Sequence, residues 1–223
     1  MRGLKWHRIV IAALSLCGLF LAFVINVPQL LAFPYKAQYG SSTVYSEVPI
    51  GPEMKDVVAQ ADALTRKSAI YAADGYATNI FLTDGGWRWT LLALQSRGAF
   101  AISRPFSNGI IINRTDISRK MVRNGKMIGG ARNLSSVIAH ERTHGLIRHR
   151  YGRLKAAMLP IMNVEGYCDY VAQESSLTPA QYEALKAKGQ SHPAMPYYEG
   201  RMEAKYWLDI EEMSVDDYFS IPG

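Results

Sequence analysis

The stretch from Ile9 to Phe33 has no charged side chain and limits what this part of the protein can become. Its 25 residues are mostly Ile, Leu, Ala, Val and Phe. A helix of this length, rising about 1.5 Å per residue, can cross a hydrocarbon core about 30 Å thick. Inside lipid, a lone segment satisfies its own backbone hydrogen bonds only as a helix. We therefore expect one transmembrane helix near the N-terminus.

The charges beside this stretch predict its orientation. Arg2, Lys5 and Arg8 precede it, and only Lys36 follows it closely. This bias places the N-terminus in the cytoplasm and the rest of the chain across the membrane, in the periplasm if the protein is bacterial. The bulky segment QLLAFPYKA offers no small-x-small cleavage site, so we expect an uncleaved anchor. A cleaved signal peptide is the alternative.

Downstream of the anchor, the chain is long enough for one domain with a proper core. We expect a tail and anchor over residues 1–33, a linker over 34–50 and the domain over 51–223. The net charge of +6 falls to +3 without the three basic tail residues, which leaves 22 basic against 19 acidic residues. This mild excess argues against nucleic acid as a partner. The basic run 113–132 is interpreted as a solvated loop, with an anionic lipid surface or an acidic substrate as alternatives.

The order of elements favours an α+β fold, with a small mixed sheet followed by a helical half. Apolar runs predict strands, and amphipathic spacing predicts a helix from Pro52 to about Ala73. The predicted strands are 79–84, 98–103 and 109–113. From Asn133 onward the pattern is helical, and the predicted helix caps are Asn133, Asn163 and Thr178.

Two histidines four residues apart, His140 and His144, stand in the stretch VIAHERTHGLI. On a helix these positions lie on one face, so both imidazoles can reach one metal ion. Glu141 is turned by about 100° from His140, where a base for a metal-activated water is needed. The pattern is rare by chance in a chain with five histidines. Two helix histidines with solvated or packed roles are the alternative.

A catalytic zinc site needs a third protein ligand, and the next predicted helix, NVEGYCDYVA, offers Glu165. Asp169 follows four residues later on the same helix face. It can accept the free ring N–H of a zinc-bound histidine and fix its tautomer. The alternative for Glu165 is an acid favoured by the dipole near a helix N-terminus.

Together, HERTH and the downstream PIMNVEGYCDY resemble the gluzincins, the thermolysin and aminopeptidase type of zinc metallopeptidase. The resemblance covers roughly Gly98 to Gly200 and implies a zincin-like fold. It implies Zn²⁺ bound by His140, His144 and Glu165, with Glu141 as general base. The stretch GAFAISRPFSNGIIIN also resembles the edge-strand region of small peptidase-MA-like domains, where a strand pairs with the substrate backbone.

The resemblance also implies a donor for the oxyanion of the reaction. In MPYYEG, Tyr197 stands where aminopeptidases of this group carry a tyrosine, although a packing role is the alternative. His192 competes for the role because an imidazole N–H can donate the same bond. Arg142 occupies a position that is usually uncharged in such helices, and we expect it to face the cleft or solvent. Cys168 is expected to be a buried apolar residue rather than a ligand.

These observations predict a membrane-anchored zinc metallopeptidase acting on a peptide or protein substrate. A membrane-tethered binding module with structural zinc or none is one alternative. A zinc hydrolase acting on a non-peptide amide or ester is another. The sequence leaves open the substrate, endo- against exopeptidase action, and the oligomeric state.

Overall fold

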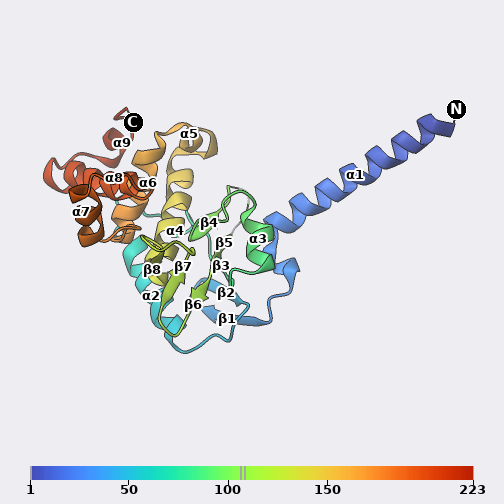
Figure 1. The fold of residues 1–223 in the computed structure, drawn as a ribbon, viewed down its shortest axis with the longest axis horizontal. Helices are drawn as coiled ribbons and strands as arrows, with labels where there is room; N and C mark the ends of the chain where they lie inside the picture. Colours follow the sequence, from blue (N-terminus) through green and yellow to red (C-terminus); the bar gives the residue numbers. More distant parts are fainter. Residues whose placement is uncertain (1, 106, 108, 223) are drawn as a thin grey trace.

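A long N-terminal helix, α1 (Arg2–Asn26), projects from a mixed α+β body in the computed structural model of the protein (Figure 1). The structure describes residues 2–105, 107 and 109–222. The Trp6–Asn26 part of α1 is long and apolar enough to cross a membrane. The helix ends before Phe33 because Pro28 follows closely, and a residue preceding proline is disfavoured in the helical region. A 3₁₀ turn, η1 (Pro28–Leu31), comes next.

The segment 34–50 is part of the sheet, so the predicted linker is wrong. Strands β1 (Tyr35–Tyr39) and β2 (Ser42–Ser46) form an antiparallel hairpin there. The buried face of β2 carries Ser42, Val44 and Ser46. Because these positions are serines, the sequence pattern predicted a polar linker here. In the structure both hydroxyls are buried and have hydrogen-bond partners within the fold.

The main sheet is mixed, as predicted, and its strands run in the order β1-β2-β3-β5-β4 in the described part of the chain. The central strands β2, β3 (Asn79–Leu82) and β5 (Gly109–Ile112) are parallel. Strand β4 (Ala101–Ser103) pairs antiparallel with β5, with Ile102 opposite Ile111, and forms one edge. The strands predicted over 79–84, 98–103 and 109–113 are therefore confirmed in type.

Helices cover both faces of this sheet because successive strand residues point to opposite sides. Ile80 and Leu82 pack against α2 (Glu53–Thr65) and α4 (Leu134–Tyr151). Phe81 points the other way and packs with α3 (Trp87–Ala93). Helix α2 begins as predicted but ends at Thr65 rather than near Ala73, where turns replace it.

A helical half follows α4, as predicted, and gathers at the C-terminal side of the molecule (Figure 1). It contains α5 (Arg153–Met158), α6 (Ile161–Ala172), α7 (Pro179–Ala187), α8 (Met195–Lys205), the π turn η2 (Tyr206–Ile210) and α9 (Val215–Tyr218). The predicted cap at Thr178 is confirmed, because its hydroxyl accepts the backbone N–H of Gln181.

The other two predicted caps are wrong in detail. Asn133 does stand at the cap position of α4, but its side chain donates to Glu174 on a neighbouring segment. Asn163 lies inside α6, which begins after Pro160, and its amide donates to the carbonyls of Tyr218 and Ile221. In both cases the side chain forms hydrogen bonds with a partner that is distant in the sequence, so it does not cap the helix.

The basic run 113–132 contains a small second sheet rather than only a solvated loop. Strands β6 (Thr115–Asp116), β7 (Met121–Arg123) and β8 (Ala131–Asn133) pair antiparallel. Strand β8 leads directly into α4, and its Arg132 is buried. The solvated-loop interpretation is therefore wrong for the end of the run that approaches the motif helix.

Candidate metal centre

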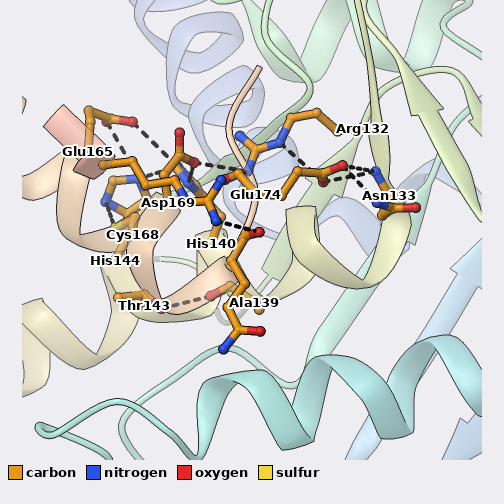
Figure 2. Close-up of polar contacts among 12 residues, drawn as sticks. Arg132, Asn133, Ala139, His140, Thr143, His144, Glu165, Cys168, Asp169 and Glu174 are labelled. Carbon is orange, nitrogen blue, oxygen red and sulfur yellow. Dashed lines mark hydrogen bonds and ion pairs between the residues drawn. The ribbon is translucent and has the colours of Figure 1, made fainter. Parts of the chain in front are cut away.

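The two motif histidines and Glu165 converge on one point between α4 and α6 (Figure 2). His140 Nε2 and His144 Nε2 lie 3.2 Å apart. The Glu165 carboxylate places Oε2 3.4 Å from His140 Nε2 and Oε1 3.6 Å from His144 Nε2. Three potential ligand groups from two helices therefore face one another.

These separations fit a zinc ion. Zinc binds histidine nitrogen at about 2.0–2.1 Å and carboxylate oxygen at about 2.0–2.2 Å. Tetrahedral ligands at such distances lie roughly 3.4 Å from one another. The three separations in the structure, 3.2, 3.4 and 3.6 Å, centre on this value. The site therefore has the donor types and the spacing that zinc requires, although the role of these residues as ligands stays a prediction.

Asp169 holds His140 from behind the site, as its position in the sequence predicted. Its Oδ1 lies 2.7 Å from His140 Nδ1, on the side of the ring opposite Nε2 (Figure 2). The same oxygen lies 2.9 Å from the Arg132 guanidinium, which also forms a 2.8 Å hydrogen bond to the Glu174 carbonyl. Asp169 and Arg132 are both buried. This arrangement keeps a proton on Nδ1 and points Nε2 toward Glu165, where a metal ion would displace any proton that Nε2 carries.

His144 has a different partner behind it, the thiol of Cys168. The sulfur lies 3.5 Å from His144 Nδ1, and Cys168 is fully buried, as predicted. The Cys168 sulfur and one nitrogen from each histidine also lie within 4.8 Å of one another. A His/His/Cys site is thus a geometric alternative. The histidine Nε2 atoms, however, face Glu165, whereas the thiol faces Nδ1 of His144.

Burial and the neighbouring charges shift the pKa values of this cluster. Burial lowers the pKa of His140, but hydrogen bonds to Asp169 and Glu165 outweigh it and raise that pKa to about 10. Burial also lowers the pKa of His144. Burial raises the pKa of Asp169, but the charge of Arg132 and the hydrogen bond to His140 together outweigh it and hold this pKa below its ordinary value. Burial raises the pKa of Cys168 well above that of a free thiol.

A pocket of about 430 Å³ opens in front of the histidines. Glu141 and the segment 98–103, which includes edge strand β4, line it. Tyr197 lines it from α8 and is half-exposed, and burial raises the pKa of its hydroxyl. His192 accepts the backbone N–H of Ala194 at Nδ1, 3.2 Å away. The structure therefore brings Tyr197, rather than His192, to the pocket.

No known protein family, curated protein or solved structure matches this chain.

Two arginines near the motif have roles that the sequence pattern did not reveal. Arg142 is fully buried, so the expectation that it faces the cleft or solvent is wrong. Its guanidinium forms a 2.6 Å ion pair with Asp62 and a 2.8 Å hydrogen bond to Ser42, and it lies over the ring of Tyr76. Arg132, which belongs to the basic run of the sequence, is buried and pairs with Asp169. The sequence pattern does not reveal the partners of either arginine, because these partners are distant from it along the chain.

Proposed function

We propose that this protein is a membrane-anchored zinc metallopeptidase of the gluzincin type with a zincin-like fold. The observation that carries the proposal is the convergence of His140, His144 and Glu165 at separations that suit zinc. A structural zinc site usually has four protein ligands, whereas a catalytic site has three and an open position. The open pocket beside these three residues supports a catalytic rather than a structural zinc site.

The chain supplies the groups that hydrolysis of an amide requires. A zinc ion held there would polarise the scissile carbonyl and make an attacking water more acidic. The Glu141 carboxylate takes the proton of that water and passes it to the leaving amine. The Tyr197 hydroxyl donates a hydrogen bond to the oxyanion as it develops. Asp169 holds the His140 ring in one tautomer throughout.

The edge strand favours a peptide over other amides or esters. Strand β4 lines the pocket, and in the described sheet it is paired on one side, with β5. Its other edge can align an extended peptide through backbone hydrogen bonds. With the N-terminus in the cytoplasm, the pocket lies on the far side of the membrane, in the periplasm if the protein is bacterial.

The decisive experiment measures zinc content and peptide cleavage on the purified full chain. We expect one zinc per chain, lost in Glu165→Ala and His144→Ala. Glu141→Gln should keep the zinc and lose turnover, because its carboxylate acts on the water rather than on the metal. The matched control is Cys168→Ala, which should keep the zinc because the thiol faces Nδ1 of His144.

Three results would contradict the proposal. Zinc retained in Glu165→Ala but lost in Cys168→Ala would establish the His/His/Cys site instead. Zinc bound without cleavage of a broad peptide library would favour a binding module or a hydrolase of non-peptide bonds. Cleavage that survives Glu141→Gln would reject the assignment of the general base.

A further inference from the structure

In the described part of the chain, the pocket wall next to the proposed zinc ligands contains an arginine that forms no ion pair. Arg148 lies four residues after His144 on α4, so the two side chains emerge on one face of the helix, one turn apart. Both line the pocket. The Arg148 guanidinium reaches across to edge strand β4 and donates to Ser103 Oγ at 3.3 Å. In residues 2–105, 107 and 109–222, no carboxylate lies within ion-pair distance of it.

The other cationic side chains that line the pocket have either a counter-charge or water around them. Arg132 is balanced by Asp169 and Glu174, which lie 2.9 Å and 3.6 Å from its guanidinium. Lys126 is exposed, so water solvates its ammonium group. Arg148 is half-buried and keeps its charge, because an arginine side chain does not lose its proton in proteins. The Glu141 carboxylate attracts this charge only from beyond ion-pair distance. A partly desolvated charge without a direct counter-charge is costly unless a ligand supplies one.

We propose that Arg148, together with Ser103, forms a subsite that binds a carboxylate of the substrate. The inference rests on the proposed function, because it assumes that a peptide occupies this pocket along β4. A guanidinium recognises a carboxylate through two parallel hydrogen bonds. One helical turn is about 5.4 Å, and an extended peptide advances about 3.4 Å per residue. The recognised carboxylate therefore lies within about two residues of the bond that is cleaved.

A substrate can present this carboxylate in two ways, as the free C-terminus of a chain or as an Asp or Glu side chain. The first makes the enzyme trim chain ends, and the second makes it select acidic sequences. Both sources have the same chemistry at Arg148.

Binding of labelled alanine pentapeptides to the full chain in detergent tests the subsite. Glu141→Gln serves as the background, so that bound peptide is not cleaved, and fluorescence anisotropy measures the dissociation constant. The three probes are a peptide with a free C-terminal carboxylate, its amide, and amides with one Glu at each position in turn. We expect at least one carboxylate probe to bind about 10- to 100-fold more tightly than the plain amide.

Variants then assign this preference to Arg148. Arg148→Gln should abolish the difference between the carboxylate and amide probes, and Arg148→Lys should restore part of it. The matched control is Arg150→Gln on the same helix, because Arg150 is exposed and pairs with Asp216 outside this pocket. This control should leave the preference unchanged. The probe that binds most tightly identifies the source of the carboxylate.

Two outcomes would overturn the subsite. Equal binding of carboxylate and amide probes to the Glu141→Gln chain would show that no carboxylate is recognised. Equal weakening of all probes by Arg148→Gln would assign Arg148 a structural role. The same titration without zinc distinguishes a failure of the carboxylate subsite from a failure of the proposed peptidase function. An Arg148-dependent preference in a protein that neither binds zinc nor cleaves peptides would leave the subsite standing and reject the peptidase.

Discussion

Asp169 contacts two basic groups at once, His140 on the side of the proposed metal site and Arg132 on the side of the sheet. Its carboxylate therefore connects β8, α4 and α6 at the centre of the proposed site. Burial makes these contacts strong, because few water molecules compete for the carboxylate. A change at this residue affects both the orientation of a proposed ligand and the stability of a buried cation.

We predict that Asp169→Asn lowers zinc affinity by about 10- to 100-fold, because the acceptor behind His140 loses its charge. The control is Glu174→Gln, which removes the other acid next to Arg132 and does not touch His140. Both variants should lower the free energy of unfolding by on the order of 1–3 kcal/mol. Competition with a zinc chelator and urea unfolding measure the two effects. An equal loss of zinc affinity in both variants would show that Arg132, rather than His140, transmits the effect.

At the scale of elements, the position of Glu165 depends on how closely α6 approaches α8. The two helices cross at Gly166 and Gly200, where their backbones touch. A Cβ atom at Gly166 would lie 2.4 Å from the Gly200 carbonyl oxygen, which is closer than a Cβ atom comes to another heavy atom in real proteins. Because Gly166 directly follows Glu165, the close crossing holds the proposed third ligand against the motif helix.

We predict that Gly166→Ala forces the helices apart, lowers the free energy of unfolding by about 1–3 kcal/mol and weakens zinc binding. Gly200→Ala should be milder, because its Cβ would meet the Met162 carbonyl oxygen at 3.1 Å. Thermal unfolding and zinc titration of both variants measure this gradation. If Gly166→Ala bound zinc as tightly as the unchanged protein, the crossing would not control Glu165.

At the scale of the whole molecule, the end of α1 is attached to the pocket side of the domain. Arg104 donates to the carbonyl of Ile25 at 2.7 Å and also to the carbonyl of Leu92 in α3. The preceding residue, Ser103, lines the pocket. If α1 spans a membrane, the pocket therefore lies close to the membrane surface. Figure 1 shows the path from α1 through α3 to β4.

The segment after α1 belongs to the fold, which determines where the chain can be shortened. Leu31 and Phe33 pack on the Phe81 side of the sheet, and Arg88 donates to the carbonyls of Leu31 and Ala32. We predict that a chain starting at Val27 stays folded and no longer binds vesicles. A chain starting at Pro34 should unfold more easily by about 2 kcal/mol, because it lacks this apolar burial. Vesicle flotation and urea unfolding test both, and equal stability would show that η1 contributes nothing.

What could be predicted from the sequence were features that depend on residues close together along the chain. The i and i+4 spacing of His140 and His144, the Thr178 cap and the apolar α1 follow from the geometry of one helix. The contact of Asp169 with His140 was also predicted, because its spacing from Glu165 placed it on the same face of α6.

The tertiary structure alone decided the features in which a distant partner competes with a local preference. The segment expected to be a linker contains strand β2, in which serines are buried. Arg142 lies in the core, where it pairs with Asp62, rather than in the cleft. Arg148 has no ion-pair partner among the described residues for the same kind of reason, since the packing of α4 against β4 determines which groups surround its charge. The sequence by itself therefore determined the helices and the residues they present. Long-range packing decided which charges are neutralised and which face the pocket, because burial and pairing depend on segments that meet only in the folded chain.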